Sequence, residues 1–389
     1  MNSFAFWCRP KKDGGLAHAE KCGIEAMVNI NLWIADGLER GKRGSTAFDF
    51  GLMLSFETSG YQSFEGNNVP LQDGEESTGQ NECPSILDCI KGVSLYCPFR
   101  IGESQFSDLM PQLNKETLGA IFNDRCRVSE VDFTSRYVMV NLANDGSERE
   151  FLLLSCDEPK FEECNSGAGT IISIDFPNVV RGVGVGARSV YVRFRLCVDQ
   201  DSGLIKRSDS RDKLFTSAFG REEAIDLRIN DYRTLTDEMR ERVDGVDPDA
   251  YRLSTVTVHT LLMARTSVAV ESFESLREKR LLEGGNVWGG YLPEGLADSD
   301  VVAWHWKKKL DSPGDGYKMY LKLSYSVCNW LTILPYLLFL TAFSIFTNAL
   351  TTVLCEMTHI GSTGVVCGSF AVCVLLSCFV VLNARRASK

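Results

Sequence analysis

The sequence lacks the short motifs that carry most enzyme chemistry. No cysteine pair has CxxC spacing, so the two close pairs that a structural zinc site needs are absent. The four histidines form no HxxxH or HExxH pattern, and no GxxxxGK[ST] or GxSxG segment occurs. We therefore predict that the protein is not an enzyme and has no catalytic residues, no metal site and no cofactor. We expect most of its 14 cysteines to be reduced, buried thiols.

Charge is scarce in the C-terminal 67 residues, where only Glu356, Arg385, Arg386 and Lys389 are charged. This segment contributes +2 to the formal net charge of −10, so residues 1–322 carry −12. An acidic body of this kind argues against a generally basic nucleic-acid binder but allows a local basic groove. The first residues also lack an apolar run of secretory length. We accordingly expect residues 1–300 to be cytoplasmic.

Two long apolar runs occupy residues 323–384. The first contains 33 consecutive positions without a formal charge, at 323–355, and about 20 apolar residues are enough to cross a bilayer. We predict two transmembrane helices near 330–354 and 360–384, joined by a short link without lysine or arginine. Basic residues precede the pair and form the tail at 385–389, so both termini are expected in the cytoplasm.

A juxtamembrane segment is predicted at 301–322. Within it, Trp304 and Trp306 are expected to anchor at the membrane interface, because aromatic rings favour the headgroup region. The lysines that follow are expected to contact anionic lipid. They are Lys307, Lys308 and Lys309.

The two predicted spans carry further patterns, which leave two interpretations open. A polar stripe recurs at helical spacing in the first span, and small residues in the second include a GxxxG. In one interpretation the hydroxyls bond their own helix and the small residues only pack the hairpin. In the other, the stripe lines an oligomeric pore. The stripe comprises Thr341, Ser344, Asn348, Thr351 and Thr352, and the packing residues are Gly364, Gly368 and Ala371.

Residues 1–300 are predicted to form an α+β domain dominated by antiparallel sheet, with a possible subdivision near 62–84. Apolar and polar residues alternate along many segments, and Asn144-Asp145-Gly146 is typical of a hairpin turn. Strands are expected at 48–56, 137–142, 148–154, 170–176, 189–198, 224–229, 255–263 and 267–270. Helices are expected at 17–38, at 115–122 and from a Thr236 cap to Gly245.

One predicted strand carries the candidate ligand site. Arg188, Tyr191, Arg193 and Arg195 lie together in sequence, with the last three on one side of the strand. Guanidinium groups match phosphates and tyrosine stacks on a base, so we expect these residues to bind a nucleotide or oligonucleotide. The alternative is a water-facing strand side that is paired with acidic residues across the sheet.

The combined architecture resembles the membrane effectors of bacterial anti-phage defence, and the Hailong-type effector in particular. The likeness rests on the β-rich domain, the segment AIDLRIND at 224–231 and the two-span hairpin with basic flanks. It implies a homo-oligomeric, tetrameric ion channel in the bacterial inner membrane. It also implies control by single-stranded DNA oligomers from a partner nucleotidyltransferase, with depolarisation and abortive infection when the channel opens. The alternative is a membrane-anchored scaffold or receptor in which the hairpin is only a tether.

Overall fold

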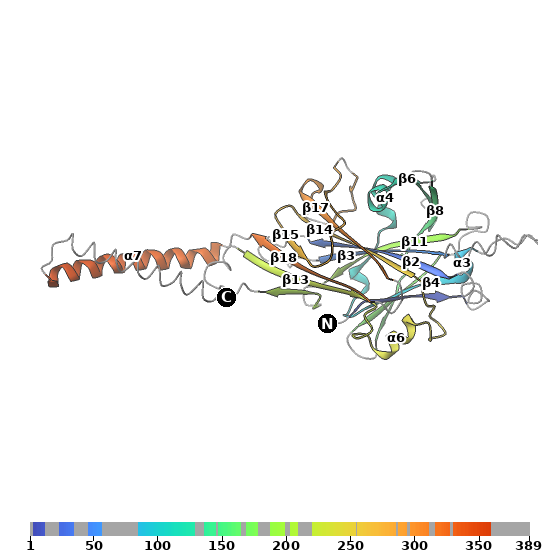
Figure 1. The fold of residues 1–389 in the computed structure, drawn as a ribbon, viewed down its shortest axis with the longest axis horizontal. Helices are drawn as coiled ribbons and strands as arrows, with labels where there is room; N and C mark the ends of the chain where they lie inside the picture. Colours follow the sequence, from blue (N-terminus) through green and yellow to red (C-terminus); the bar gives the residue numbers. More distant parts are fainter. Residues whose placement is uncertain are drawn as a thin grey trace, which may run out of the picture. The chain divides into compact units, whose positions relative to one another are not determined.

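The computed structural model describes most of the chain up to residue 358 (Figure 1). The described residues are 3–11, 23–34, 46–56, 85–128, 136–144, 147–164, 169–177, 187–198, 203–208, 220–253, 255–284, 287–293, 296–310, 316–326 and 330–358. In the last range, side chains are described at only part of the positions. Contacts divide the chain into a β-rich unit, Met1–Ser208 with Glu222–Tyr325, and a second unit, Asp209–Arg221 with Ser326–Lys389.

The main sheet of the β-rich unit contains ten described strands in the order β16-β17-β14-β2-β3-β11-β8-β7-β6, with β5 pairing beside this path on β11. Most neighbours are antiparallel, whereas β14 with β2 and β11 with β8 are parallel. The strands are β2 (Ile24–Ile34), β3 (Thr46–Phe56), β5 (Phe106–Asp108), β6 (Arg125–Val128), β7 (Tyr137–Asn144), β8 (Ser147–Leu154), β11 (Ser189–Val198), β14 (Thr255–Arg265), β16 (Glu278–Leu281) and β17 (Val301–Leu310).

Two four-stranded sheets complete this unit. One has the order β1-β4-β10-β9 and the other β12-β13-β18-β15. Their strands are β1 (Ala5–Pro10), β4 (Ile90–Cys97), β9 (Lys160–Glu163), β10 (Thr170–Asp175), β12 (Ile205–Ser208), β13 (Gly220–Ile229), β15 (Ala269–Ser272) and β18 (Tyr317–Ser326).

The helices of the β-rich unit are short. Asn114 caps α4 (Lys115–Phe122) and Thr236 caps α6 (Asp237–Val243), each through a side-chain oxygen that accepts a backbone N–H. In Figure 1, α4 lies beside β6 and β8, whereas α6 lies on the opposite side of the layered sheets. The remaining short elements are α3 (Ile86–Cys89), η1 (Glu103–Gln105), η2 (Met110–Gln112) and η4 (Asp298–Asp300).

One part of the core is aromatic and lies against one face of the main sheet. Phe4, just before β1, packs its ring against Phe48 and Phe50 of β3 at centroid distances of 6.4 and 5.3 Å. Phe50 also stacks on Phe194 of β11. Because side chains alternate across a strand, this packing directs Asp49, Arg193 and Arg195 to the other face.

The structure confirms that this domain is β-rich, as predicted, with most strand neighbours antiparallel. The structure also confirms β11, α4, α6 and the hairpin at residue 144, where Asn144 pairs with Ser147. The predicted helix at 17–38 is wrong over its described part, because Ile24–Ile34 forms β2 between β14 and β3. Its alternating residues bury against the aromatic core, and this burial outweighs helix propensity.

The segment at 301–322 is also different from the prediction. Instead of a separate juxtamembrane segment it contributes β17 and most of β18, each paired inside a sheet. Trp304 and Trp306 are only 5% and 3% exposed, so their predicted place at a membrane interface is wrong. Lys307, Lys308 and Lys309 follow them and are exposed.

The described part of the second unit is dominated by α7 (Trp330–Thr358). Its range covers the first predicted span, but the second span, with Gly364, Gly368 and Ala371, lies outside the described residues, as do 62–84 and the tail. A search of the described residues for a helix long and apolar enough to cross a membrane finds none. The two-helix hairpin stays a prediction.

Candidate functional site

Polar residues form two neighbouring rows on the face of the main sheet opposite the aromatic core. The cross-strand register of β17, β14, β2, β3 and β11 places them side by side. We call this surface the polar face. One row is Lys307, His259, Asn29, Gly51 and Arg193, and the next is His305, Leu261, Asn31, Asp49 and Arg195.

The β3–β11 end of the polar face is buried and centred on Asp49, which is 0% exposed. Arg195 donates from Nε and Nη2 to its two carboxylate oxygens at 2.6 and 3.0 Å. Trp33 Nε1 and the Tyr291 hydroxyl donate to Oδ2 at 2.6 and 2.8 Å. These donors satisfy the carboxylate, which makes the ion pair a fixed element of the interior.

Arg193, also 0% exposed, lies next to this ion pair without a carboxylate of its own. Its Nε donates to the Tyr291 hydroxyl at 2.5 Å and its Nη1 to the Tyr191 hydroxyl at 2.8 Å. In the described part of the chain, Nη2 has no hydrogen-bond partner. Burial alone lowers the pKa of Arg193, but the two tyrosine oxygens and Asp49 outweigh it, so the pKa is raised and the side chain stays charged.

The predicted ligand site is therefore wrong in its main part. Tyr191 and Arg193 are fully buried and Arg195 is 8% exposed, because β11 lies inside the sheet and Tyr291 covers this end. Arg188 stays exposed just before β11. The structure brings Tyr191, Arg193 and Arg195 together, but around buried partners rather than toward solvent.

The β14–β17 end of the polar face is open. His259 and His305 are partly exposed, with Nδ1 of His259 3.1 Å from Nε2 of His305 and with rings stacked at 5.3 Å between centroids. Lys307 lies beside His259 in the register, and the backbone N–H of Arg277 donates to the carbonyl of His305. Sequence analysis missed this pair because the two histidines are 46 residues apart.

Burial and positive neighbours keep both histidines neutral near pH 7. Burial is the largest cause, and together with the charges of Lys307 and Arg277 it lowers the pKa of each ring to about 4, although Glu278 partly offsets these charges at His305. The described residues contain no group of three or more His, Cys, Asp or Glu side chains placed to hold a metal ion. The chemistry available at this end is therefore that of neutral imidazoles beside cations.

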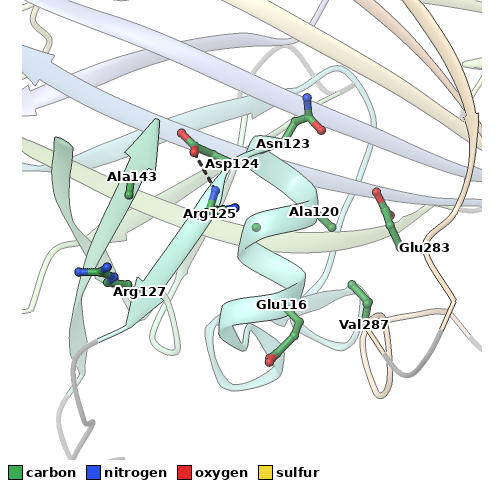
Figure 2. A pocket seen from close by; sticks show the side chains of 10 residues that line it. Glu116, Ala120, Asn123, Asp124, Arg125, Arg127, Ala143, Glu283 and Val287 are labelled. Carbon is green, nitrogen blue, oxygen red and sulfur yellow. Dashed lines mark hydrogen bonds between the residues drawn. The ribbon is translucent and has the colours of Figure 1, made fainter. Parts of the chain in front are cut away.

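A recess lies between α4 and β6, with a volume of about 850 Å³ (Figure 2). Figure 2 shows Glu116 and Asn123 along α4, with Arg125 and Arg127 on the adjacent strand and Glu283 on the opposite side of the helix. Its side chains carry both signs of charge, with Asp124 completing the acidic set. Because both signs of charge line the recess, its electrostatics do not favour either an anionic or a cationic ligand.

The acidic cluster on β13 and after it is structural. Asp231 accepts ion pairs from Arg228, Arg233 and Lys318, and Glu222 pairs with Lys322. Burial raises the pKa of Asp231, but the hydrogen bond from Arg233 and the nearby cations outweigh it, and the net pKa is lowered.

The predicted polar stripe lies in α7. Thr341, Thr351 and Thr352 donate their hydroxyls to the carbonyls four residues earlier, at 2.8, 2.8 and 3.0 Å. The structure also describes Ser344 and Asn348. At 100° per residue, these two residues and the three threonines lie within an arc of about 100° on one side of α7. The three threonine hydroxyls therefore need no water or partner helix to satisfy their donors.

No protein-family model matches the chain, and no curated protein matches it significantly. The fold and site define a β-rich, largely antiparallel protein with a buried arginine–aspartate centre, an open histidine–lysine surface and an apolar helix after the last strand.

Proposed function

We propose that the protein is a membrane-embedded effector in which the β-rich unit receives a signal and α7, with the segment that follows, acts in a lipid bilayer. The main observation in support is the exposure of large apolar side chains on α7. At 100° per residue these positions are distributed around the whole helix rather than on one face. They are Leu334, Leu337, Leu338, Leu340, Phe343, Ile345, Phe346, Leu350 and Val353, each at least 46% exposed.

A helix that is apolar on every side is stable in a lipid or a protein interior and unfavourable in water. In the sequence, residues 330–355 contain no formal charge, and about 20 apolar residues are enough to cross a bilayer. This composition supports the proposal that α7 enters the membrane as the first helix of a two-helix hairpin.

In its full form the proposal is a homo-oligomeric, tetrameric channel of the bacterial inner membrane that acts in anti-phage defence. Its cytoplasmic unit binds a nucleotide or single-stranded DNA oligomer made by a partner nucleotidyltransferase, and channel opening depolarises the cell. Ser344 and Asn348 line the pore in this proposal, together with the threonine face of α7, because two spans per chain enclose a channel only as an oligomer.

A membrane-anchored receptor without a pore is the second candidate, and a specific observation favours it. The hydroxyls of Thr341, Thr351 and Thr352 already bond within α7, so the polar stripe does not require a water-filled lumen. In this alternative the helices only hold the β-rich unit at the membrane.

Current across a planar bilayer that contains the purified full chain distinguishes the two. The channel proposal predicts current that short oligonucleotides alter and that the double substitution Ser344→Leu with Asn348→Leu reduces at least tenfold. The matched control is Leu338→Ala with Leu340→Ala, which leaves the polar stripe intact. Absence of current under all conditions, with the protein inserted, contradicts the channel and leaves the receptor.

A further inference from the structure

The open end of the polar face concentrates exposed cations. Lys307 and Lys309 on β17 and Arg277 before β16 are exposed, and none of the ion pairs formed in the described part of the chain includes them. By contrast, Lys318 and Lys322 on β18 both pair with acidic residues. In a chain with a net charge of −10, such a cluster is a local positive field.

The histidine pair adds hydrogen-bonding groups to this field. One imidazole donates to the other across 3.1 Å, which leaves Nε2 of His259 and Nδ1 of His305 outside the shared bond. In the neutral pair one of these outer nitrogens is a donor and the other an acceptor, and uptake of one proton makes both of them donors while the shared bond is kept. The pair therefore changes from a neutral unit to a cationic one with two outward donors by taking up a proton.

A divalent metal is the other ligand that two imidazoles at this spacing can bind. The surrounding charges disfavour it, since Lys307, Arg277 and Arg280 all act on these histidines, and among the described residues Glu278 is the carboxylate that does so. A metal site would also need further ligands, and the described residues supply no third one. The same charges favour an anion.

We propose that His259, His305, Lys307 and Arg277 form a binding site for a tetrahedral oxyanion, such as a phosphate group or sulfate, and that the site takes up a proton when it binds. Lys307 and Arg277 supply fixed charge, and the imidazoles supply N–H donors. The site differs from the buried arginines of β11 and does not depend on whether the protein forms a channel.

The proton linkage follows from the groups that face the pair. β17 contributes Lys307 and Lys309, β16 contributes Arg280 and Glu278, the latter opposite His305, and β2 contributes the neutral Asn29 and Asn31. Arg277 precedes β16, and its charge acts on both rings. This mostly cationic surrounding opposes protonation in the free protein. A bound dianion reverses the local field and raises the pKa of the pair, so binding tightens as pH falls.

Sulfate is a suitable probe because it stays dianionic from pH 5.5 to 7.5, and any proton uptake then belongs to the protein. Isothermal titration calorimetry of the purified full chain is expected to show about tenfold tighter binding at pH 5.5. Lys307→Ala is expected to weaken binding about tenfold. Lys308→Ala, on the same strand but pointing to the other face, is expected to change it less than twofold.

Two further arms complete the test. His305→Gln is expected to remove the pH dependence, and inorganic phosphate compared with a nucleoside monophosphate shows whether the free ion or a nucleotide is preferred. Equal sulfate affinity in the two lysine variants overturns the site, and binding that is independent of pH overturns the proton linkage. Zn²⁺ binding that His305→Gln abolishes, with sulfate binding unchanged, assigns the pair to a metal instead. None of these outcomes alters the bilayer-current result.

Discussion

The β-rich unit and α7 place their large apolar side chains in opposite environments. In the β-rich unit, Trp33 and Tyr291 are 0% exposed and pack around a satisfied ion pair. In α7, Leu338, Ile345 and Phe346 are 62%, 65% and 61% exposed. Apolar side chains in a water-filled environment are normally covered, so the first pattern is that of an ordinary packed interior and the second is not. The comparison thus separates a unit whose large apolar side chains are covered from a helix whose large apolar side chains are exposed.

The largest effect is expected from charges placed on α7. A lysine at the centre of a membrane helix costs about 2.5–3.5 kcal/mol, so Leu338→Lys with Ile345→Lys should disfavour insertion by roughly 5–7 kcal/mol. Alkaline-carbonate extraction should then release the variant while the wild-type chain stays in the membrane pellet. Val246→Lys, at an exposed apolar residue of the β-rich unit, is the control and should stay in the pellet. Release of the control as well would contradict the comparison.

The next largest effect concerns the buried ion pair. Asp49→Ala leaves Arg195, Trp33 and the Tyr291 hydroxyl without their acceptor, and removing one partner of a buried pair costs about 3–5 kcal/mol. Urea unfolding followed by tryptophan fluorescence measures the loss. Asp157→Ala removes an exposed pair with Arg136 and should cost at most about 1 kcal/mol. Equal losses of stability for the two variants would show that the buried Asp49–Arg195 pair contributes no more than an exposed ion pair.

A methyl group at Gly51 tests how tightly the buried end is packed. A Cβ there would lie 2.1 Å from the Tyr191 hydroxyl oxygen and 2.7 Å from Nη1 of Arg193. Gly51→Ala is therefore expected to lower the free energy of unfolding by about 1–3 kcal/mol. Gly102→Ala, where nothing lies within 4 Å of the added atom, should change it by less than about 0.5 kcal/mol. An unchanged free energy of unfolding in Gly51→Ala would mean that the side chains of Tyr191 and Arg193 move aside at little cost.

The smallest effect is expected from the pH dependence of the histidine pair. The pKa of each ring is about 4 in the folded protein and about 6.5 in the unfolded chain, so between these values the unfolded state binds more protons. Above pH 6.5 the rings are neutral in both states, and the pair does not lower the free energy of unfolding. As pH falls from 6.5 toward 4, the rings protonate first in the unfolded chain, and the free energy of unfolding decreases. After allowance for partial exposure the loss is about 1–2 kcal/mol. Urea unfolding of wild type and of His259→Gln with His305→Gln should differ in pH slope over this range, and identical slopes would refute the linkage.

Much of the fold could be predicted because it depends on local alternation. β11 has the predicted bounds Ser189–Val198, and the caps Asn114 and Thr236 mark helices that their sequences favour. The failure at β2 has a physical reason. Glu25, Ala26 and Met27 favour helix, but pairing with β14 and β3 buries alternate residues of this segment, and tertiary packing prevails over propensity.

The site could not be predicted because its partners are distant in sequence. Arg195 is 146 residues from Asp49, and His259 meets His305 only because β14 pairs with β17. Lys307 follows two tryptophans, a pattern also typical of membrane interfaces, and nothing local indicates that those rings face a core. The polar stripe of α7 was visible in sequence, whereas the backbone bonds of its threonines required the structure.

Quenching by lipids with brominated acyl chains tests the membrane location of α7. Five of the six tryptophans lie buried in the β-rich unit, so in a Trp330→Phe background a tryptophan at Leu338 is the probe that bromine can reach. We expect strong quenching of Leu338→Trp in vesicles and none of Val246→Trp. Quenching of Leu338→Trp by aqueous acrylamide, with no effect of brominated lipid, would contradict the membrane-embedded effector.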